Sequence, residues 1–535
     1  MKEKIELSLK EALTQLFEGG KLGRFDVAKV ALTRPTDEQF GDYTTNIALI
    51  ISKEVGMKPR EFAEALKQGL ESTINNQQST ILERIEIAGP GHINFFLAEA
   101  AYSETLQHIL KDESRYGNSM QGDGEKVNNE FISANPTGPL HLGNGRGGFY
   151  ADTLSRVLEK AGYDVTNEYY VNDAGEQVMK LGHSVLKDSE AVYGGEYIEQ
   201  LATSNQQTTV RETGEWAAKE ILEEMIKPVV QDTMRVRFDQ WTSEKQVVTD
   251  GYVDKAINIL KDKELTFEEE GALWLRTTNF GDDKDRVLIK KDGVKTYFAS
   301  DCGYILNKME RGFTALIETW GADHHGYTKR FEAVARQLGF AGSIRFTLVQ
   351  MVRLMKDGEE VRMSKRAGNV VGIDELIETV GHDVARFFFV MYSPDTHMNF
   401  DLGLAEERSE KNPVYYVQYA YARLSSILRK AEESNLKPSI EQLDLLVHPK
   451  EKLLMRELMA FPELIERMAG DKTVHALPQY AIRLADRLHS FYADCQVVDS
   501  ENQALSGARL SLIQATKIVL AETLRLIGVS APEKM

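Results

Sequence analysis

The sequence predicts an α/β protein of about three domains, with an α+β domain first, a parallel-sheet domain in the middle and an all-α helical bundle last. Three observations support this. The 535 residues are too many for one core, and the mix of 42% hydrophobic and 27% charged residues is that of a soluble globular protein. A strand, a glycine-containing loop and an amphipathic helix follow one another over residues 126–161. Helical periodicity dominates from residue 373 to the end.

The first domain is expected at residues 1–115. Apolar periodicity predicts helices near 5–17, 43–54 and 60–72. Alternating patterns predict strands at 83–88 and 92–97, separated by Gly89-Pro90-Gly91. Nothing in this region is typical of a catalytic site.

The middle domain is expected at residues 116–405, after a polar, glycine-containing linker. Its first half reads as strand, helix and strand up to residue 175. Residues 176–283 are charged and mostly helical, so we interpret them as an insertion between the two halves of the sheet. Three strands are expected after it, at 286–290, 314–320 and 344–349.

The last domain is expected at residues 406–535, as a helical bundle. Its helix from 414 to 431 has an apolar stripe on one face. Four tyrosines lie in or beside this stripe, together with Arg423. These are Tyr415, Tyr416, Tyr419 and Tyr421. They either pack the bundle or stack on unpaired RNA bases.

The loop of the middle domain is the first candidate site. Asn135-Pro136-Thr137-Gly138-Pro139 must be irregular, and His141-Leu142-Gly143-Asn144 leads into the helix. A helix start that follows a strand presents free N–H groups and a positive dipole end to an anion. A phosphate site is therefore one interpretation, and an ordinary strand-to-helix connection is the other.

A second stretch strengthens the first interpretation. Arg362-Met363-Ser364-Lys365-Arg366 follows H-L-G-N by more than two hundred residues, and the pair resembles the HIGH and KMSKS signatures of class I aminoacyl-tRNA synthetases. The segments S-A-N-P-T-G-P-L-H, Y-F-A-S-D, W-G-A-D-H-H-G-Y and the terminal A-P-E-K-M resemble bacterial arginyl-tRNA synthetases. The resemblance covers essentially the whole chain and implies a Rossmann-type catalytic domain with a connective insertion.

The resemblance implies an arginine–tRNA ligase. Such an enzyme joins arginine to ATP as arginyl-adenylate, and then transfers arginine to the 3′-terminal adenosine of tRNA(Arg), releasing pyrophosphate and AMP. His141, Ser364 and Lys365 would be catalytic, since they can donate to phosphate oxygens. The ATP site would comprise Pro139, His141, Gly143, Asn144, Met363 and Lys365. Asn144 stands where the family has a second histidine, so either it donates to phosphate or it only caps the helix.

Arginine needs a carboxylate for its guanidinium and a second acceptor for its α-ammonium. The resemblance assigns the guanidinium to Asp301, with Tyr297 one turn earlier. Glu130 and Asn135 would be further substrate contacts, and Asp323 would lie near the ammonium. Without the family, Glu130 and Asp301 would be read as surface carboxylates.

The resemblance also assigns tRNA contacts at the two ends of the chain. Asn94 and Phe95 would touch the corner of the tRNA near the D-loop, although a core position for Phe95 is the alternative. The anticodon loop would be met by Tyr416, Tyr419, Tyr492 and Met535.

Composition limits the remaining classes. The formal net charge of −18 does not favour RNA binding overall, but local basic surface can hold a large RNA. Cys302 and Cys495 have no CxxC neighbourhood, and His324 and His325 are adjacent and cannot easily share one ion. We therefore expect ATP with Mg²⁺, no protein-bound metal, no membrane, a cytoplasmic location and a monomer.

Two other functions stay open at this point. A class I synthetase for another amino acid would need no acidic pocket for a guanidinium, so Asp301 and Tyr297 discriminate against it. An RNA-binding protein that kept the fold without catalysis would need neither His141 nor Lys365.

Overall fold

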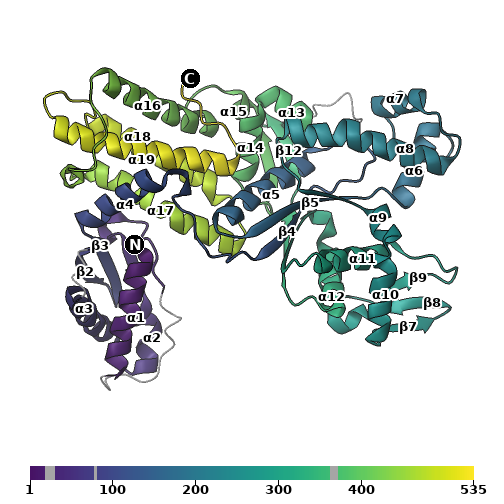
Figure 1. The fold of residues 1–535 in the computed structure, drawn as a ribbon, viewed down its shortest axis with the longest axis horizontal. Helices are drawn as coiled ribbons and strands as arrows, with labels where there is room; N and C mark the ends of the chain where they lie inside the picture. The colour runs from purple at the N-terminus through teal and green to yellow at the C-terminus, as the bar shows by residue number, and fades with distance from the viewer. Residues whose placement is uncertain (19–30, 77–80, 362–370) are drawn as a thin grey trace.

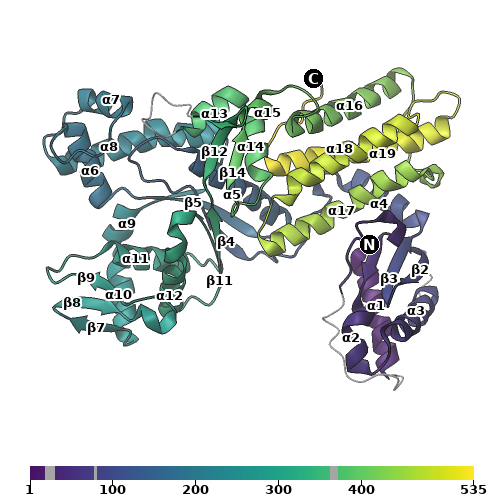
Figure 2. The same cartoon turned by 180° about the vertical axis from the view of Figure 1, so that it is seen from behind.

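The computed structural model describes residues 1–18, 31–76, 81–361 and 371–535. Figure 1 shows an N-terminal unit attached below a long helical bundle, with the central sheet beside that bundle. Two further groups of elements extend from the other side of the sheet, and Figure 2 shows the same arrangement from behind.

The N-terminal unit packs helices on a small antiparallel sheet. Its helices are α1 (Lys2–Glu18), α2 (Ile47–Val55) and α3 (Pro59–Asn76), with a short 3₁₀ turn at Glu38–Phe40. Its strands are β1 (Tyr43–Thr45), β2 (Leu82–Ala88) and β3 (His92–Leu97), in the order β1-β3-β2. The helix expected at 43–54 is thus wrong at its start, because Tyr43, Thr44 and Thr45 pair with β3.

The central sheet has five parallel strands in the order β11-β10-β4-β5-β6. They are β4 (Lys126–Glu130), β5 (Asp164–Val171), β6 (Gln240–Ser243), β10 (Ala315–Gly321) and β11 (Ser343–Val349). This confirms the α/β class with a parallel-sheet domain. The strand β6 lies within the range predicted as an insertion, and its pairing with β5 makes it part of the sheet.

Helix α4 (Glu99–Asp112) follows the N-terminal unit and packs against the helical bundle, whereas α5 (Leu142–Lys160) packs on the central sheet. After β5 come α6 (Glu176–Leu186), α7 (Glu196–Ser204) and α8 (Val210–Glu220), and two π-helical turns at Ile221–Ile226 and Val229–Thr233. Short 3₁₀ turns occur at Glu113–Arg115, Thr277–Phe280, Ala322–Tyr327 and Leu443–Leu445.

A second small sheet lies beyond β6. It contains β7 (Thr266–Glu269), β8 (Ala272–Leu275) and β9 (Arg286–Ile289), all antiparallel. The strand expected at 286–290 therefore exists, but it belongs to this sheet. Around it pack α9 (Glu244–Thr249), α10 (Tyr252–Asp262), α11 (Tyr297–Glu310) and α12 (Thr328–Leu338).

The last part of the middle region returns toward α5. It comprises β12 (Val352–Lys356), β13 (Glu359–Glu360), α13 (Ile373–Val380), α14 (His382–Val390), β14 (Met398–Asp401) and α15 (Leu402–Glu406). Helical periodicity missed β14, which pairs in parallel with β12. Four long helices then form the bundle: α16 (Pro413–Glu433), α17 (Pro449–Asp471), α18 (Ala476–Asp494) and α19 (Gln503–Ile527).

Within the described ranges, no helix combines the length and the apolar character needed to span a membrane.

Candidate functional site

The loop after β4 ends at His141, which is the N-cap of α5. Its Nδ1 accepts hydrogen bonds from the backbone N–H groups of Gly143 at 3.1 Å and Asn144 at 3.3 Å. The Asn144 side chain completes the cap, since its Oδ1 accepts from the His141 N–H at 3.1 Å. Nδ1 is therefore an acceptor, and a neutral ring carries its proton on Nε2, where it can be donated outward.

Burial lowers the pKa of His141 below its ordinary value, although Asp323 opposes this effect. A neutral imidazole with one N–H, held at a helix start, can donate to a phosphate oxygen without a charge of its own. Gly143 is needed for this arrangement, because an added Cβ would lie 3.0 Å from Cε1 of the His141 ring.

The residues after the second signature pass beside His141. Gly372 forms an antiparallel bridge with His141, and the Ile373 N–H donates to the Leu140 carbonyl at 3.1 Å. Ile373 packs so closely on α5 that a Cβ at Gly145 would lie 2.3 Å from it. Met363, Ser364 and Lys365 themselves lie outside the described residues.

Asp301 lies in the first turns of α11, and the hydroxyl of Tyr327 donates to its Oδ2. Burial raises the pKa of Asp301 to about 8, and the nearby Glu244 and Glu130 carboxylates add to the shift. A nearby cation would stabilise the ionised form of this carboxyl group, and a guanidinium is such a cation.

Glu244 is a neighbour that the sequence analysis missed. It follows β6 at the edge where parallel strands end, and it is only 5% exposed. Burial raises the pKa of Glu244 to about 7, and its Oε2 has no hydrogen-bond partner within the described part of the chain. A buried acceptor without a donor is costly unless a ligand supplies one. Nothing in the sequence analysis pointed to Glu244, because residues 176–283 are interpreted there as an insertion and β6 is not predicted.

Glu130 ends β4 and is 5% exposed. Its Oε2 accepts from the Tyr304 hydroxyl at 2.8 Å and from Lys308 Nζ at 2.6 Å. Its Oε1 accepts from the Ser133 hydroxyl at 3.0 Å. Glu130 is thus not a surface carboxylate, and Ser133 is a second polar group that the sequence analysis did not name.

Tyr297, Asn135 and Asn172 lie at the outer side of this cluster. Tyr297 is 59% exposed, and its hydroxyl lies 3.3 Å from Oδ1 of Asn172, whose amide donates to Asn135 Oδ1 at 2.8 Å. Asp323 is exposed beside His324 after β10. The structure therefore brings together Glu130, Asn135, Tyr297 and Asp301, and it leaves Asp323 nearer to His141.

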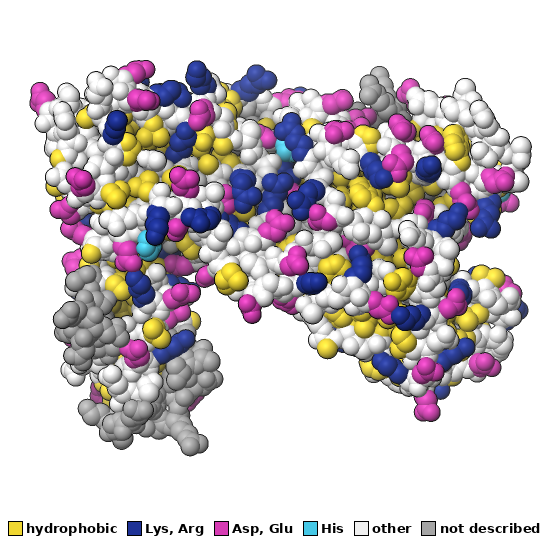
Figure 3. Space-filling model, in the orientation of Figure 1, with side chains coloured by type: hydrophobic (Ala, Val, Ile, Leu, Met, Phe, Trp, Pro, Cys, Tyr) yellow, Lys and Arg dark blue, Asp and Glu magenta, His cyan; other side chains and the backbone are white. Residues whose placement is uncertain are grey.

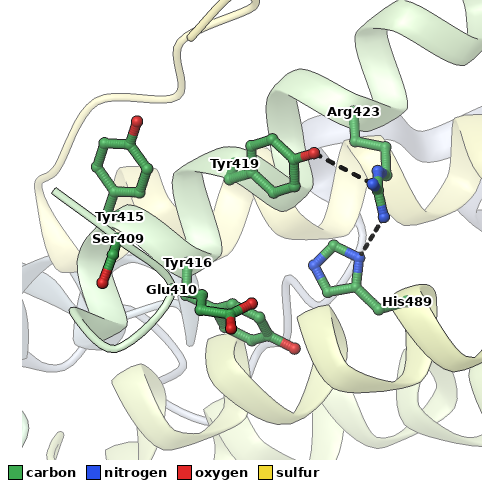
Figure 4. Close-up of a pocket in the computed structure, with 7 residues that line it drawn as sticks. All are labelled: Ser409, Glu410, Tyr415, Tyr416, Tyr419, Arg423 and His489. Atoms are coloured by element: carbon green, nitrogen blue, oxygen red, sulfur yellow. Dashed lines mark hydrogen bonds between the residues drawn. The ribbon is translucent and has the colours of Figure 1, made fainter.

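A hollow of about 600 Å³ lies on the helical bundle, between α16 and α18 (Figure 4). It is lined by Ser409, Glu410, Tyr415, Tyr416, Tyr419, Arg423 and His489. Arg423 donates to the Tyr419 hydroxyl at 3.1 Å and lies 3.1 Å from Nδ1 of His489 (Figure 4). The Tyr492 ring lies 5.4 Å from the Arg423 guanidinium, and Tyr492 and Met535 are exposed. Aromatic rings and a guanidinium at the surface are suited to stacking with bases.

The expected exposure of Asn94 and Phe95 is wrong. Asn94 is buried and its Oδ1 accepts from the Thr44 hydroxyl at 2.7 Å, while Phe95 is fully buried in the core. Successive residues of a strand face opposite sides, so the neighbouring Phe96 is partly exposed. The Arg84 guanidinium lies over the Phe96 ring, 3.6 Å from the ring centroid.

Comparison with known proteins identifies the family of this chain. Three family models match: the arginyl tRNA synthetase N terminal domain at residues 3–97, the tRNA synthetases class I (R) catalytic domain at 105–202 and 215–387, and the DALR anticodon binding domain at 417–535.

Among the described residues, no cluster of three or more His, Cys, Asp or Glu side chains is arranged to hold a metal ion.

Relatives match over the full length. The arginine–tRNA ligase of Bacillus pumilus is 42% identical over 100% of this chain and 99% of its own. That of Bacillus subtilis is 41% identical with the same coverage. The structure of Thermus thermophilus arginyl-tRNA synthetase covers 100% of both chains at 22% identity, with a TM-score of 0.75, and so shares the fold. The chain therefore belongs to the arginyl-tRNA synthetase family of the class I tRNA synthetases.

Proposed function

We propose that this chain, an arginine–tRNA ligase, binds arginine across the carboxyl edge of its parallel sheet. The guanidinium would lie between Asp301 and Glu244, and the α-ammonium would lie at Glu130 with Ser133 and Asn135. The observation that carries this assignment is the pair of buried carboxyls with raised pKa values, one of which has an oxygen without a donor. Both features favour a cationic, multiply donating ligand.

ATP would enter beside the start of α5, accompanied by Mg²⁺. The arginine carboxylate attacks the α-phosphate, pyrophosphate leaves, and arginyl-adenylate remains. His141 would donate its Nε2–H to a phosphate oxygen on which charge develops, and Ser364 and Lys365 would do the same from the second signature. The 2′-hydroxyl of the terminal tRNA adenosine then attacks the carbonyl carbon, and AMP leaves.

The tRNA would lie along the bundle and the N-terminal unit. The hollow with Tyr416 and Tyr419 is suited to an unstacked base of the anticodon loop, with Tyr492 and Met535 beside it. Lys and Arg side chains gather near the middle of the face in Figure 3, so part of the surface is basic despite the net charge of −18. On the N-terminal unit, Phe96 and Arg84 would contact the tRNA corner in place of Asn94 and Phe95, because Asn94 and Phe95 are buried. We expect a cytoplasmic monomer.

The test is to supply ATP, tRNA(Arg) and each amino acid in turn, with citrulline as a matched neutral analogue of arginine. Citrulline keeps the length and planarity of arginine but has no positive charge. We expect charging with arginine, and none detectable with lysine or citrulline. Efficient charging of tRNA with citrulline would show that the two carboxylates do not select the substrate by charge.

A further inference from the structure

One face of α11 carries residues for both ends of the substrate. Tyr297, Asp301, Tyr304 and Lys308 follow at helical spacing, so they share a face. The first two belong to the proposed guanidinium end. The last two reach Glu130, at the proposed ammonium end. Lys308 has no part in the function proposed above, yet it touches this carboxylate directly.

Lys308 is an unusual lysine. It is fully buried, and its Nζ lies 2.6 Å from Glu130 Oε2 and 2.6 Å from Glu318 Oε1. The two carboxylates raise the pKa of Lys308 above its ordinary value despite burial, so it remains an ammonium. One cation thus joins α11 to two neighbouring strands, β4 and β10.

Two carboxyl groups in this cluster share one cation. Glu168 is paired with Arg311 through two hydrogen bonds of 2.8 and 2.7 Å. Glu130 and Glu318 both contact Lys308. Burial raises the pKa of Glu318 well above its ordinary value, so Glu318 keeps its proton and leaves Lys308 as the cation of Glu130. The groups facing Lys308 are Glu130 on β4, Glu168 on β5, Glu318 on β10, and Tyr304 and Arg311 on and after α11.

We propose that Lys308 is a positioning residue for arginine recognition: it holds the Glu130 carboxylate at the sheet edge, in the orientation that accepts the substrate α-ammonium. The proposal rests on the function proposed above. Lys308 itself touches neither arginine nor ATP.

The test compares Lys308→Met with the double variant Lys308→Met/Glu318→Gln, in aminoacylation assays with saturating tRNA. In Lys308→Met, we expect the KM for arginine to rise about 100-fold, because breaking a buried ion pair leaves Glu130 unsupported. The KM for ATP should stay within about twofold. The kcat at saturating arginine should change much less than the KM, because Lys308 contacts no reacting atom.

The double variant separates positioning from a loss of folding stability. Glu318→Gln removes the buried carboxyl group that Lys308→Met leaves without a cation, so thermal stability should return toward that of the wild type. The KM for arginine should stay raised, because nothing replaces the bond to Glu130. A folded double variant with the wild-type KM for arginine would overturn the proposal.

Lys160→Met is the matched control. Lys160 is also a buried lysine, 2.9 Å from Glu522, but its partner lies on α19 in the helical bundle. This variant should lose stability and keep the KM for arginine. If the wild type charges arginine and the Lys308 variants behave like the control, only the role of Lys308 is refuted. If the wild type does not charge arginine, the proposed function itself fails.

Discussion

The Asp301 carboxyl group is partly buried and accepts a hydrogen bond from the Tyr327 hydroxyl. Its folded pKa of about 8 is far above the value of about 3.9 for an exposed aspartate. A group with a raised folded pKa destabilises the fold as pH rises, because the unfolded chain loses its proton first. This cost begins above about pH 4 and is complete above pH 8. The carboxyl group proposed to bind arginine therefore lowers the folding stability of the protein as pH rises.

We predict that Asp301→Asn makes the arginine-free protein more heat-stable at alkaline pH. The amide removes the cost of the buried charge, so Tm near pH 9 should rise by about 2 °C or more, with little change near pH 5. Thermal unfolding at both pH values measures the effect. The same variant should raise the KM for arginine at least 100-fold, since a buried guanidinium without its carboxylate costs several kcal/mol. Unchanged arginine affinity would remove Asp301 from the site.

A second prediction concerns pH and substrate binding. The guanidinium stays charged, whereas Glu244 and Asp301 ionise with pKa values of about 7 and about 8. The KM for arginine should therefore fall as pH rises from about 6 to 8.5, by up to about tenfold per unit. Measurements at constant ionic strength with saturating ATP and tRNA test this. Glu244→Gln should make the curve shallower at its acidic end, and an identical curve would place Glu244 outside the site.

At the scale of elements, the start of α5 combines a structural and a chemical role. His141 caps the helix through Nδ1, which leaves Nε2–H free to donate at the proposed ATP site. The Asn144 side chain is engaged with the backbone of His141, which supports the capping role over direct phosphate donation. A substitution at position 141 can separate the two roles, because asparagine there would still be a good N-cap but would have no imidazole N–H.

The third prediction uses this difference. His141→Asn should keep the stability of the wild type and slow adenylate formation by about 10²–10³-fold, the scale for losing one aligned donor. Asn144→Ala should cost about 1 kcal/mol of stability and much less activity. Pyrophosphate exchange in the presence of tRNA, together with thermal unfolding, measures both. Equal loss of activity in the two variants would show that Asn144 acts on phosphate as well.

At the scale of the whole molecule, ion pairs attach the N-terminal unit to the bundle. Arg34 contacts Glu463 at 2.7 Å, and Arg456 contacts Asp42 at 2.9 Å. Glu463 and Arg456 both belong to α17, so this helix makes both ion pairs with the N-terminal unit. The Tyr43 hydroxyl also donates to Glu463 at 2.6 Å. These contacts join the proposed surface for the tRNA corner to the bundle that carries the proposed anticodon surface. The residues proposed for the chemistry lie between 130 and 365, outside both units.

The fourth prediction follows from that separation. Tyr419→Ala should raise the apparent constant for tRNA by about 5- to 150-fold, because stacking on one base is worth about 1–3 kcal/mol. Affinities for ATP and arginine should change little once tRNA is saturating. Tyr421→Ala is a control for lost packing, since Tyr421 is buried on the same helix. A Tyr416→Ala/Tyr419→Ala variant that charges sub-saturating tRNA normally would place anticodon reading elsewhere.

Local patterns determined much of this molecule in advance. The strand at 126–130, the helix after His141 and the strand at 92–97 follow from periodicity and turn residues alone, and the paired signatures indicated the family. Other features depended on which faces meet in space. Alternation could not say which of Phe95 and Phe96 faces inward, and helical periodicity did not reveal β14.

The arginine pocket shows the physical reason most clearly. Glu244 and Asp301 are 57 residues apart and become neighbours only because β6 joins the parallel sheet beside β5. Lys308 reads as an ordinary lysine on an amphipathic helix until β4 and β10 place carboxylates on both sides of it. Short-range sterics determine which residues share one side of a strand or helix, and this can be read from the sequence. Burial, and with it the pKa and the binding chemistry, is decided by the long-range packing of those faces.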